Sequence, residues 1–372
     1  MSGSTSGDTN TCTLLVASAG DQLTELYALR DRFVGLGPIE WATFDSPHAR
    51  ELLAGETVHL VPQVHARDLR GAMSNLPQAQ RLLSERRVGR VVSTGAGIAV
   101  PFLLTARRLG LPAHYVESAA RATHPSLTGA LVARIPGVHL YSQHLWREPG
   151  WSLRGSVFDG YVATPVLPPA RLDRVVVTLG TDADSSFRAA AQNVAASLRE
   201  IGRGTHEVLW QTGSTDVSGL DIDAHPSIPF HDLQQAVSEA DLVISDAGVG
   251  SAMLALSTGK VPVLLPRRRH RGEHADDHQV ELADALHRRG LAQHVEVDAV
   301  TPESLTAGLG RTALRTAAAT TDFHLTAEHD RSARSVRRMH ALATPRVVVP
   351  LQPQPEWVPA LVVNRGQRPL AG

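Results

Sequence analysis

Four glycine-rich turns each follow directly on a short apolar run of the sequence. Such apolar runs are typical of buried strands, and glycine lets the backbone approach a ligand closely. A helix that follows the turn points its free N–H groups at an anion. Four such turns in one chain predict a nucleotide held between two halves of the protein. The turns are Ser18-Ala19-Gly20, Thr94-Gly95-Ala96-Gly97, Leu179-Gly180-Thr181 and Asp246-Ala247-Gly248-Val249-Gly250-Ser251.

The turns match neither of two common nucleotide-binding motifs. None fits G-x-x-x-x-G-K-[ST], which argues against a P-loop. None gives G-x-G-x-x-G with an acidic residue about 20 positions later, which argues against a dinucleotide site.

A charged run over residues 267–279 is the second candidate for a functional site. Arginine suits a phosphate, and acidic and amide side chains suit ribose and sugar hydroxyls. The alternative is a solvated loop whose charges neutralise one another. His274 and His278 could also meet on one helical face and bind zinc. No cysteine is nearby, and we expect no metal. The candidate ligand contacts in this run are Arg268, Glu273, Asp277, His278 and Gln279.

Glu117 follows the apolar run Tyr115-Val116. An acidic residue at the carboxyl end of a parallel strand faces the region where such sheets bind ligands. It could act there as a general base on a sugar hydroxyl. A salt bridge between Glu117 and Arg121 is the alternative.

These residues must be positioned by alternating strands and helices, which indicate βαβ units and parallel sheets. The pattern stops at a proline-containing stretch and then restarts. We therefore predict an α/β protein with two Rossmann-like domains that face each other across a cleft. The expected parts are a disordered leader (1–10), a first domain (11–165), a linker (166–173), a second domain with terminal helices (174–341) and a proline-rich tail (342–372).

Length and composition narrow the class of protein. The chain has 372 residues, and its 36 basic and 37 acidic residues nearly cancel, which argues against a dedicated nucleic-acid binder. The single cysteine, Cys12, cannot form an internal disulfide, as expected in a reducing compartment. No apolar run is long enough to span a bilayer. We expect a cytoplasmic protein, with any membrane contact peripheral, at the inner face.

Taken in order, these motifs resemble the glycosyltransferase family 28 superfamily, whose members have the GT-B fold. More narrowly, the chain looks like a single-chain fusion of the two subunits of the UDP-N-acetylglucosamine transferase of dolichol-linked oligosaccharide synthesis. Bacterial exopolysaccharide glycosyltransferases combine the same halves. The residues that carry the resemblance are 15–20, 93–97 and 115–118 in the first half, and 177–181, 246–251, 259–262 and 277–279 in the second.

The resemblance implies a UDP-sugar donor in the second domain and an acceptor, commonly lipid-linked, in the first. Donor contacts would come from Gly180, Thr181 and the turn of Gly248, Val249, Gly250 and Ser251, together with the charged run. The reaction would invert the anomeric carbon without a bound metal or other cofactor. Acceptor-side residues would be Ser18, Gly20, Gly95, Gly97 and Ser118.

The chain departs from the family pattern at four positions. The family's first glycine turn usually continues with Gly-His, and this chain has Asp21 and Gln22 there. Asp21 or Glu117 would therefore serve as the base. Leu254 stands where a ribose-binding glutamate is usual, and Asp246 stands where histidine is common.

The leading hypothesis is an inverting transferase that moves a hexose or N-acetylhexosamine from a UDP-sugar to a lipid-linked or polysaccharide-precursor acceptor. Two alternatives remain open. One is a tailoring glycosyltransferase for a small natural product. The other, motivated by the departures, is a catalytically silent homologue that binds nucleotide-sugars as a scaffold.

Overall fold

The structure is a computed structural model that describes residues 11–64, 68–180, 186–201, 207–316 and 323–325. These residues all belong to one compact unit, which ends at Leu325. The expected leader, the proline-rich tail, residues 326–341 of the expected terminal helices and Thr181 lie outside the described residues.

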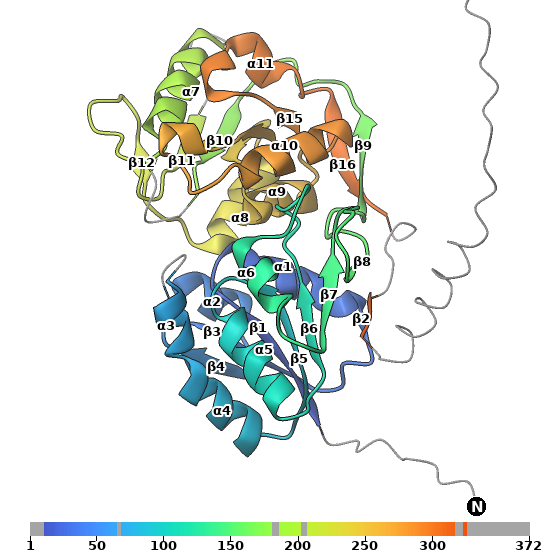
Figure 1. The fold of residues 1–372 in the computed structure, drawn as a ribbon. Coiled ribbons are helices and arrows are strands. Elements are labelled where there is room, and N and C mark those ends of the chain that lie inside the picture. The colour runs from blue at the N-terminus through green and yellow to red at the C-terminus, as the bar shows by residue number, and fades with distance from the viewer. Residues whose placement is uncertain (1–10, 65–67, 181–185, 202–206, 317–322, 326–372) are drawn as a thin grey trace, which may run out of the picture. The chain divides into compact units, whose positions relative to one another are not determined.

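A seven-stranded sheet organises the first part of the chain, shown in blue and teal in Figure 1. Its strand order is β4-β3-β1-β5-β6-β7-β8, and every neighbouring pair is parallel. We call this sheet and its helices the N-terminal half. The strands are β1 (Cys12–Ala17), β3 (Ile39–Phe44), β4 (Val58–Val61), β5 (Val88–Gly95), β6 (Ala113–Val116), β7 (Val138–Ser142) and β8 (Trp151–Leu153).

Helices lie in the connections between the strands of this sheet up to β7, and a loop over 143–150 joins β7 to β8. Two of them begin at a serine whose side chain accepts a backbone N–H of the first turn: Ser46 at α2 and Ser126 at α6. Apolar clusters cover both faces of the sheet, so a continuous apolar strand such as β1 is buried throughout. The helices are α1 (Asp21–Leu29), α2 (Pro47–Leu52), α3 (Leu69–Met73), α4 (Leu76–Glu85), α5 (Ala99–Arg108) and α6 (Leu127–Val132), with a short 3-10 turn η1 (Arg30–Arg32).

A six-stranded sheet, again with parallel neighbours throughout, organises the second part of the chain. Its order is β12-β11-β10-β13-β14-β15, and we call it and its helices the C-terminal half. The strands are β10 (Arg174–Thr178), β11 (Glu207–Gln211), β12 (Ala224–His225), β13 (Leu242–Asp246), β14 (Val263–Leu265) and β15 (Gln293–His294). The helices are α7 (Arg188–Glu200), α8 (Phe230–Glu239), α9 (Val249–Ser257), α10 (His278–Arg288) and α11 (Pro302–Thr306), with 3-10 turns η3 (Arg269–Arg271) and η4 (Val297–Ala299).

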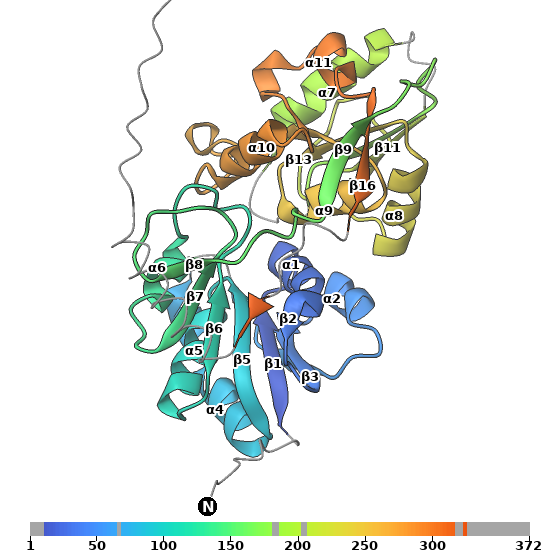
Figure 2. The ribbon, with the colours of Figure 1, turned by 90° about the vertical axis from the view of Figure 1, so that its right-hand side faces the viewer.

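Two short strand pairs lie outside these sheets. β9 (Tyr161–Pro165) pairs antiparallel with β16 (Arg311–Arg315), side by side in Figure 2. β2 (Phe33–Val34) pairs parallel with β17 (Phe323–His324). β9 thus joins the C-terminal half by pairing, although the sequence placed residues up to 165 in the first domain. The sequence analysis expected helices at the end of the second domain, but residues 311–315 form a strand whose ladder with β9 satisfies their backbone groups.

Candidate functional site

Acceptor-side residues expected from the sequence follow three adjacent strands of the N-terminal sheet. Ser18 and Gly20 follow β1, Gly95 and Gly97 close β5, and Ser118 follows β6. Ala17 is in register with Gly95, and Thr94 Oγ1 donates to the backbone oxygen of Gln22 at 2.8 Å. The first two turns therefore lie side by side at one sheet edge, as the sequence predicted for carboxyl ends of parallel strands.

Glycine is required where these turns bend sharply. Gly20, the residue before α1, has φ 93°, and Gly95 has φ 123°. A Cβ at Gly95 would also lie 3.1 Å from the hydroxyl oxygen of Tyr115. Both backbone conformations disfavour residues with a side chain, so both turns require glycine at these positions.

The corresponding edge of the C-terminal sheet gathers the turns after β10, β13 and β14. Gly180 has φ 77°, and a Cβ there would lie 2.7 Å from Asp246 Oδ2. Gly248 precedes α9, whose first turn begins with Val249, Gly250 and Ser251. These turns follow neighbouring strands, and the free N–H groups of α9 open beside them.

Asp246, at the end of β13, connects these turns. It is buried, and its Oδ1 accepts a hydrogen bond from Ser251 Oγ at 2.9 Å. Its Oδ2 accepts from Gln279 Nε2 at 3.2 Å and lies 3.9 Å from Arg267 Nε. Asp246 therefore fixes the first turn of α9 against the start of α10.

A side chain from the N-terminal half reaches the same turn. Asp21, the first residue of α1, places Oδ2 3.0 Å from where a Gly248 Cβ would lie. Its Oδ1 would be 2.6 Å from a Cβ at Gly250. α1 and α9 are neighbours in Figures 1 and 2. A carboxylate thus faces the N-terminal end of α9, where the dipole favours negative charge.

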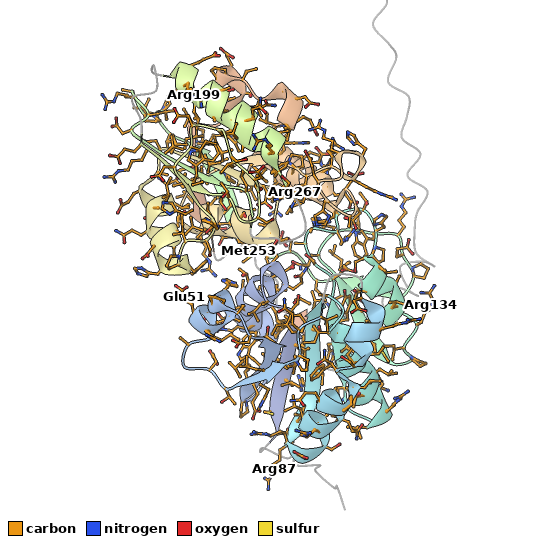
Figure 3. All side chains as sticks on the ribbon, turned by 90° about the vertical axis from the view of Figure 1, so that its left-hand side faces the viewer. Glu51, Arg87, Arg134, Arg199, Met253 and Arg267 are labelled. Atoms are coloured by element: carbon orange, nitrogen blue, oxygen red, sulfur yellow. The ribbon has the colours of Figure 1, made fainter. Side chains whose placement is uncertain are left out.

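Arg267, labelled in Figure 3, is the cation buried behind this turn. Its Nη2 donates to the backbone oxygen of Leu179 at 2.5 Å, and its guanidinium carbon lies 4.6 Å from the centre of the Phe187 ring. The sequence analysis favoured its neighbour Arg268, whose guanidinium instead pairs with Glu296. The position of Arg267 in the sequence could have identified it, because it follows the apolar run that forms β14 almost directly.

Two predicted donor contacts brace the loop before α10. Glu273 Oε2 accepts the backbone N–H of Arg268 at 2.9 Å, and Asp277 Oδ1 accepts that of Arg269 at 2.9 Å. Gln279 does reach the candidate site, because its Oε1 accepts the Arg267 N–H while its amide contacts Asp246. Arg268, Glu273 and Asp277 therefore make these contacts within the C-terminal half, with Glu296 and with backbone N–H groups of the loop.

Glu117 is only 2% exposed and its carboxylate is enclosed by the N-terminal half. Oε2 accepts both the N–H and the hydroxyl of Ser126, each at 2.9 Å, and Oε1 accepts the Tyr115 hydroxyl at 3.1 Å. Burial raises the pKa of this carboxyl above its ordinary value. The structure thus directs Glu117 to the start of α6.

Arg121 pairs with a residue of the C-terminal half rather than forming the salt bridge with Glu117 that the sequence analysis considered. Arg121 Nη2 lies 2.8 Å from Asp276 Oδ2, and the Thr123 N–H donates to Glu281 Oε2 at 2.9 Å. A second contact between the halves comes from α2. The carboxylate of its Glu51 (Figure 3) accepts the N–H groups of Phe230 and His231 at the start of α8, at 3.0 and 2.8 Å.

Glu25 is a buried acid that the sequence analysis missed. It lies one turn after Asp21 on α1, accepts the Ala119 N–H at 2.7 Å and contacts the Gln143 amide. Burial is the main cause that raises its pKa from 4.5 to about 7, and the negative charge of Asp21 adds to the effect. An acid on an amphipathic helix carries no local signal of burial, so only the fold reveals it.

Leu254 belongs to the apolar cluster that contains Val176 and Val243. It is buried, so the position at which the resemblance implies a ribose-binding glutamate faces the core. Within the residues that the structure describes, one group has the composition of a metal site: His274, Asp276 and His278.

Comparisons with known proteins bear on both halves. Residues 174–329 match the model of the glycosyltransferase family 28 C-terminal domain. The chain is 28% identical over 271 residues to the UDP-N-acetylglucosamine–N-acetylmuramyl-(pentapeptide) pyrophosphoryl-undecaprenol N-acetylglucosamine transferase of Chlorobium luteolum, covering 65% of this chain and 72% of that protein. It is 26% identical to the protein of the same name from Corynebacterium efficiens, covering 62% of this chain and 64% of that one. The chain thus spans slightly less than two thirds of the C. efficiens relative.

Solved structures extend the similarity to the whole two-sheet arrangement. Acinetobacter baumannii MurG gives a TM-score of 0.52 at 19% identity, covering 80% of this chain and 89% of that one. Spinosyn forosaminyltransferase SpnP gives 0.52 at 14% identity, covering 89% and 99%. These likenesses establish the fold, which is that of the GT-B glycosyltransferases, as the sequence predicted. Over the described ranges, no helix is long and apolar enough to cross a bilayer.

Proposed function

We propose that this GT-B chain is an inverting glycosyltransferase that moves a hexose or N-acetylhexosamine from a UDP-sugar to a lipid-linked polysaccharide precursor. The observation that carries the proposal is the meeting of Asp21 with the first turn of α9, at the carboxyl ends of strands from both sheets. The family 28 match over the C-terminal half and the N-acetylglucosamine transferases among the relatives support the donor class.

The donor diphosphate binds at the N-terminal end of α9. Free N–H groups and the helix dipole favour an anion there. Ser251 supplies a hydroxyl at the same turn, held by Asp246. As the bond to the sugar breaks, the helix end and the buried Arg267 stabilise the charge that develops on UDP. This leaving-group role requires no metal ion or other cofactor.

Asp21 is the general base. It comes from the half that carries the acceptor-side turns, yet its carboxylate lies at the donor turn. In the reaction it takes the proton of the acceptor hydroxyl while the hydroxyl oxygen attacks the anomeric carbon from the face opposite UDP. The carbon–oxygen bond to UDP breaks as the new glycosidic bond forms, so the configuration inverts.

Glu117 has a positioning role in this proposal. Its carboxylate fixes Ser126 and the start of α6, which borders the turn that contains Ser118. An enclosed carboxylate with four hydrogen-bond donors is poorly placed to take a proton from an acceptor.

The acceptor is presented by the N-terminal half, at Ser18, Gly20, Gly95, Gly97 and Ser118. A lipid-linked acceptor would place the enzyme at the inner face of the membrane as a peripheral, cytoplasmic protein. The support for this assignment is the named acceptor of the sequence relatives, a pyrophosphoryl-undecaprenol.

The donor site is tested by calorimetry and thermal shift with UDP, UDP-N-acetylglucosamine, UDP-glucose, UDP-galactose and GDP-mannose, all in the presence of a chelator. We expect UDP and one UDP-sugar to bind and stabilise the chain. Ser251→Trp should abolish this binding by filling the diphosphate position. Ser238→Trp, on the exposed side of α8, is the matched control and should bind UDP normally.

Other outcomes favour the alternatives. If a UDP-sugar binds but no sugar is transferred to any acceptor, the chain is a catalytically silent homologue. If no nucleotide binds, the proposed donor site is wrong. If UDP binds equally well to Ser251→Trp, the donor site lies elsewhere. If a small aromatic acceptor is glycosylated and a polyprenyl-pyrophosphate sugar is not, the chain is a natural-product tailoring enzyme.

A further inference from the structure

Three side chains converge just before and at the start of α10. His274, Asp276 and His278 each offer one ligand atom, and these atoms all lie within 4.8 Å of one another. His278 Nδ1 is 2.5 Å from Asp276 Oδ1, and His274 Nδ1 is 3.8 Å from the same oxygen. The two imidazole rings meet edge to face with 4.5 Å between their centres.

The loop geometry creates this group. The sequence spacing suggested a zinc pair on one helical face, but α10 begins only at His278, so His274 precedes the helix. The turn brings His274 back over His278 and inserts Asp276 between them. A third ligand, which the spacing of the histidines alone did not supply, is therefore in place.

Two imidazoles and one carboxylate form a ligand set that zinc accepts. Zinc binds histidine nitrogen and carboxylate oxygen at about 2.0–2.2 Å in tetrahedral geometry, and three protein ligands leave one position for water. All three side chains are partly exposed, between 18% and 30%, so an ion can enter from solvent.

Arg121 orients the carboxylate from the other half of the chain. Its guanidinium holds Asp276 Oδ2 at 2.8 Å, which leaves Oδ1 turned toward both histidines. A hydrogen bond to the second oxygen of a ligating carboxylate is a usual outer-shell contact at metal sites.

We propose that His274, Asp276 and His278 form a zinc site that fixes the start of α10 against Arg121 of the N-terminal half. The ion has a structural role there. It fixes the helix end that carries Gln279, which contacts Asp246 at the end of β13 and Arg267 after β14. The site does not depend on the proposed transferase activity, and its test uses neither donor nor acceptor.

The test is calorimetric titration of zinc chloride into the full chain, stripped with a chelator and carrying no histidine tag. We expect one zinc ion per chain, and Co²⁺ in its place should give the visible absorption of a four-coordinate site. His274→Ala, His278→Gln and Asp276→Asn should each weaken zinc binding by about 10-fold or more. Zinc should raise the Tm of the wild-type chain and have no such effect on these variants.

His270→Ala is the matched control, since His270 is an exposed histidine of the same loop. It should bind zinc like the wild type. Circular dichroism of the zinc-free variants checks that each is folded, and Asp276→Asn keeps the size of the side chain if an alanine variant fails. The proposal is overturned if the wild type shows no saturable zinc binding, or if His274→Ala and His278→Gln bind zinc as tightly as His270→Ala.

Discussion

Asp21 and Gly250 meet although they belong to different halves of the chain. Oδ1 of Asp21 would lie only 2.6 Å from a Cβ at Gly250, so the absence of a side chain at 250 lets the carboxylate reach the first turn of α9. The protein's own carboxylate thereby occupies the neighbourhood of a helix end that favours anions. Removing the negative charge of Asp21 should therefore strengthen donor binding and reduce turnover.

Asp21→Asn should bind UDP more tightly, because a negative charge that competes with the diphosphate is removed. The same variant should lose about 10²–10⁴-fold in kcat, because an amide cannot accept the proton of the acceptor. Calorimetry with UDP and steady-state rates measure the two effects. Asp31→Asn, whose side chain is 81% exposed, is the control. A loss in kcat of less than threefold would show that Asp21 is not the base.

Gly250→Ala should lower turnover without lowering the free energy of unfolding. Alanine favours the helix, so the free energy of unfolding should hold or rise by about 0.5 kcal/mol. The new methyl group displaces the Asp21 carboxylate, and turnover should fall by about tenfold or more. Gly308→Ala is the control, because its Cβ would make only an ordinary 3.7 Å contact with Gln293. Wild-type turnover in Gly250→Ala would mean that the observed Asp21 position has no catalytic importance.

Glu117→Gln should affect stability more than chemistry. The amide turns an N–H₂ group toward Ser126 or Tyr115, where the carboxylate accepted hydrogen bonds, at a cost of about 1–3 kcal/mol. Urea unfolding measures that cost. The pH profile of kcat/KM should keep the acidic limb that reports ionisation of the general base. Loss of that limb in Glu117→Gln, with the limb retained in Asp21→Asn, would assign the base to Glu117.

Glu25 predicts a pH dependence of stability. Its pKa rises from 4.5 to about 7 on folding, so the folded chain holds this proton more tightly than the unfolded chain does. The stabilisation is complete below pH 4.5 and is lost as the pH rises through about 7. Glu25→Gln, which carries no proton to lose, should reduce the fall in unfolding free energy between about pH 5 and about pH 8 by about 2–3 kcal/mol.

Urea titrations at the two pH values check this prediction. Glu85→Gln, at an exposed position of α4, should keep the wild-type slope. An unchanged slope in Glu25→Gln would mean that the buried carboxyl ionises as it does in the unfolded chain.

The sequence by itself determined the architecture and the edges that carry the site. Apolar runs such as 12–17 and 242–245, each followed by a glycine turn and a segment without glycine or proline in its later part, are local patterns that specify a strand, a turn and a helix. Parallel pairing then places the carboxyl ends of neighbouring strands at one edge, which is why Gly20 lies near Gly95 and Gly180 lies near Gly248.

Only the tertiary structure decided where the charged side chains point. Arg268 could serve a phosphate or Glu296, and Glu117 could face an acceptor or the start of α6, because a charged residue's partners are chosen by contacts distant in sequence. The same holds for Arg121 with Asp276 and for Asp21 with Gly250, which join segments from the two halves. Hydrogen-bond and ion-pair partners depend on long-range packing, and no local period in the sequence encodes them.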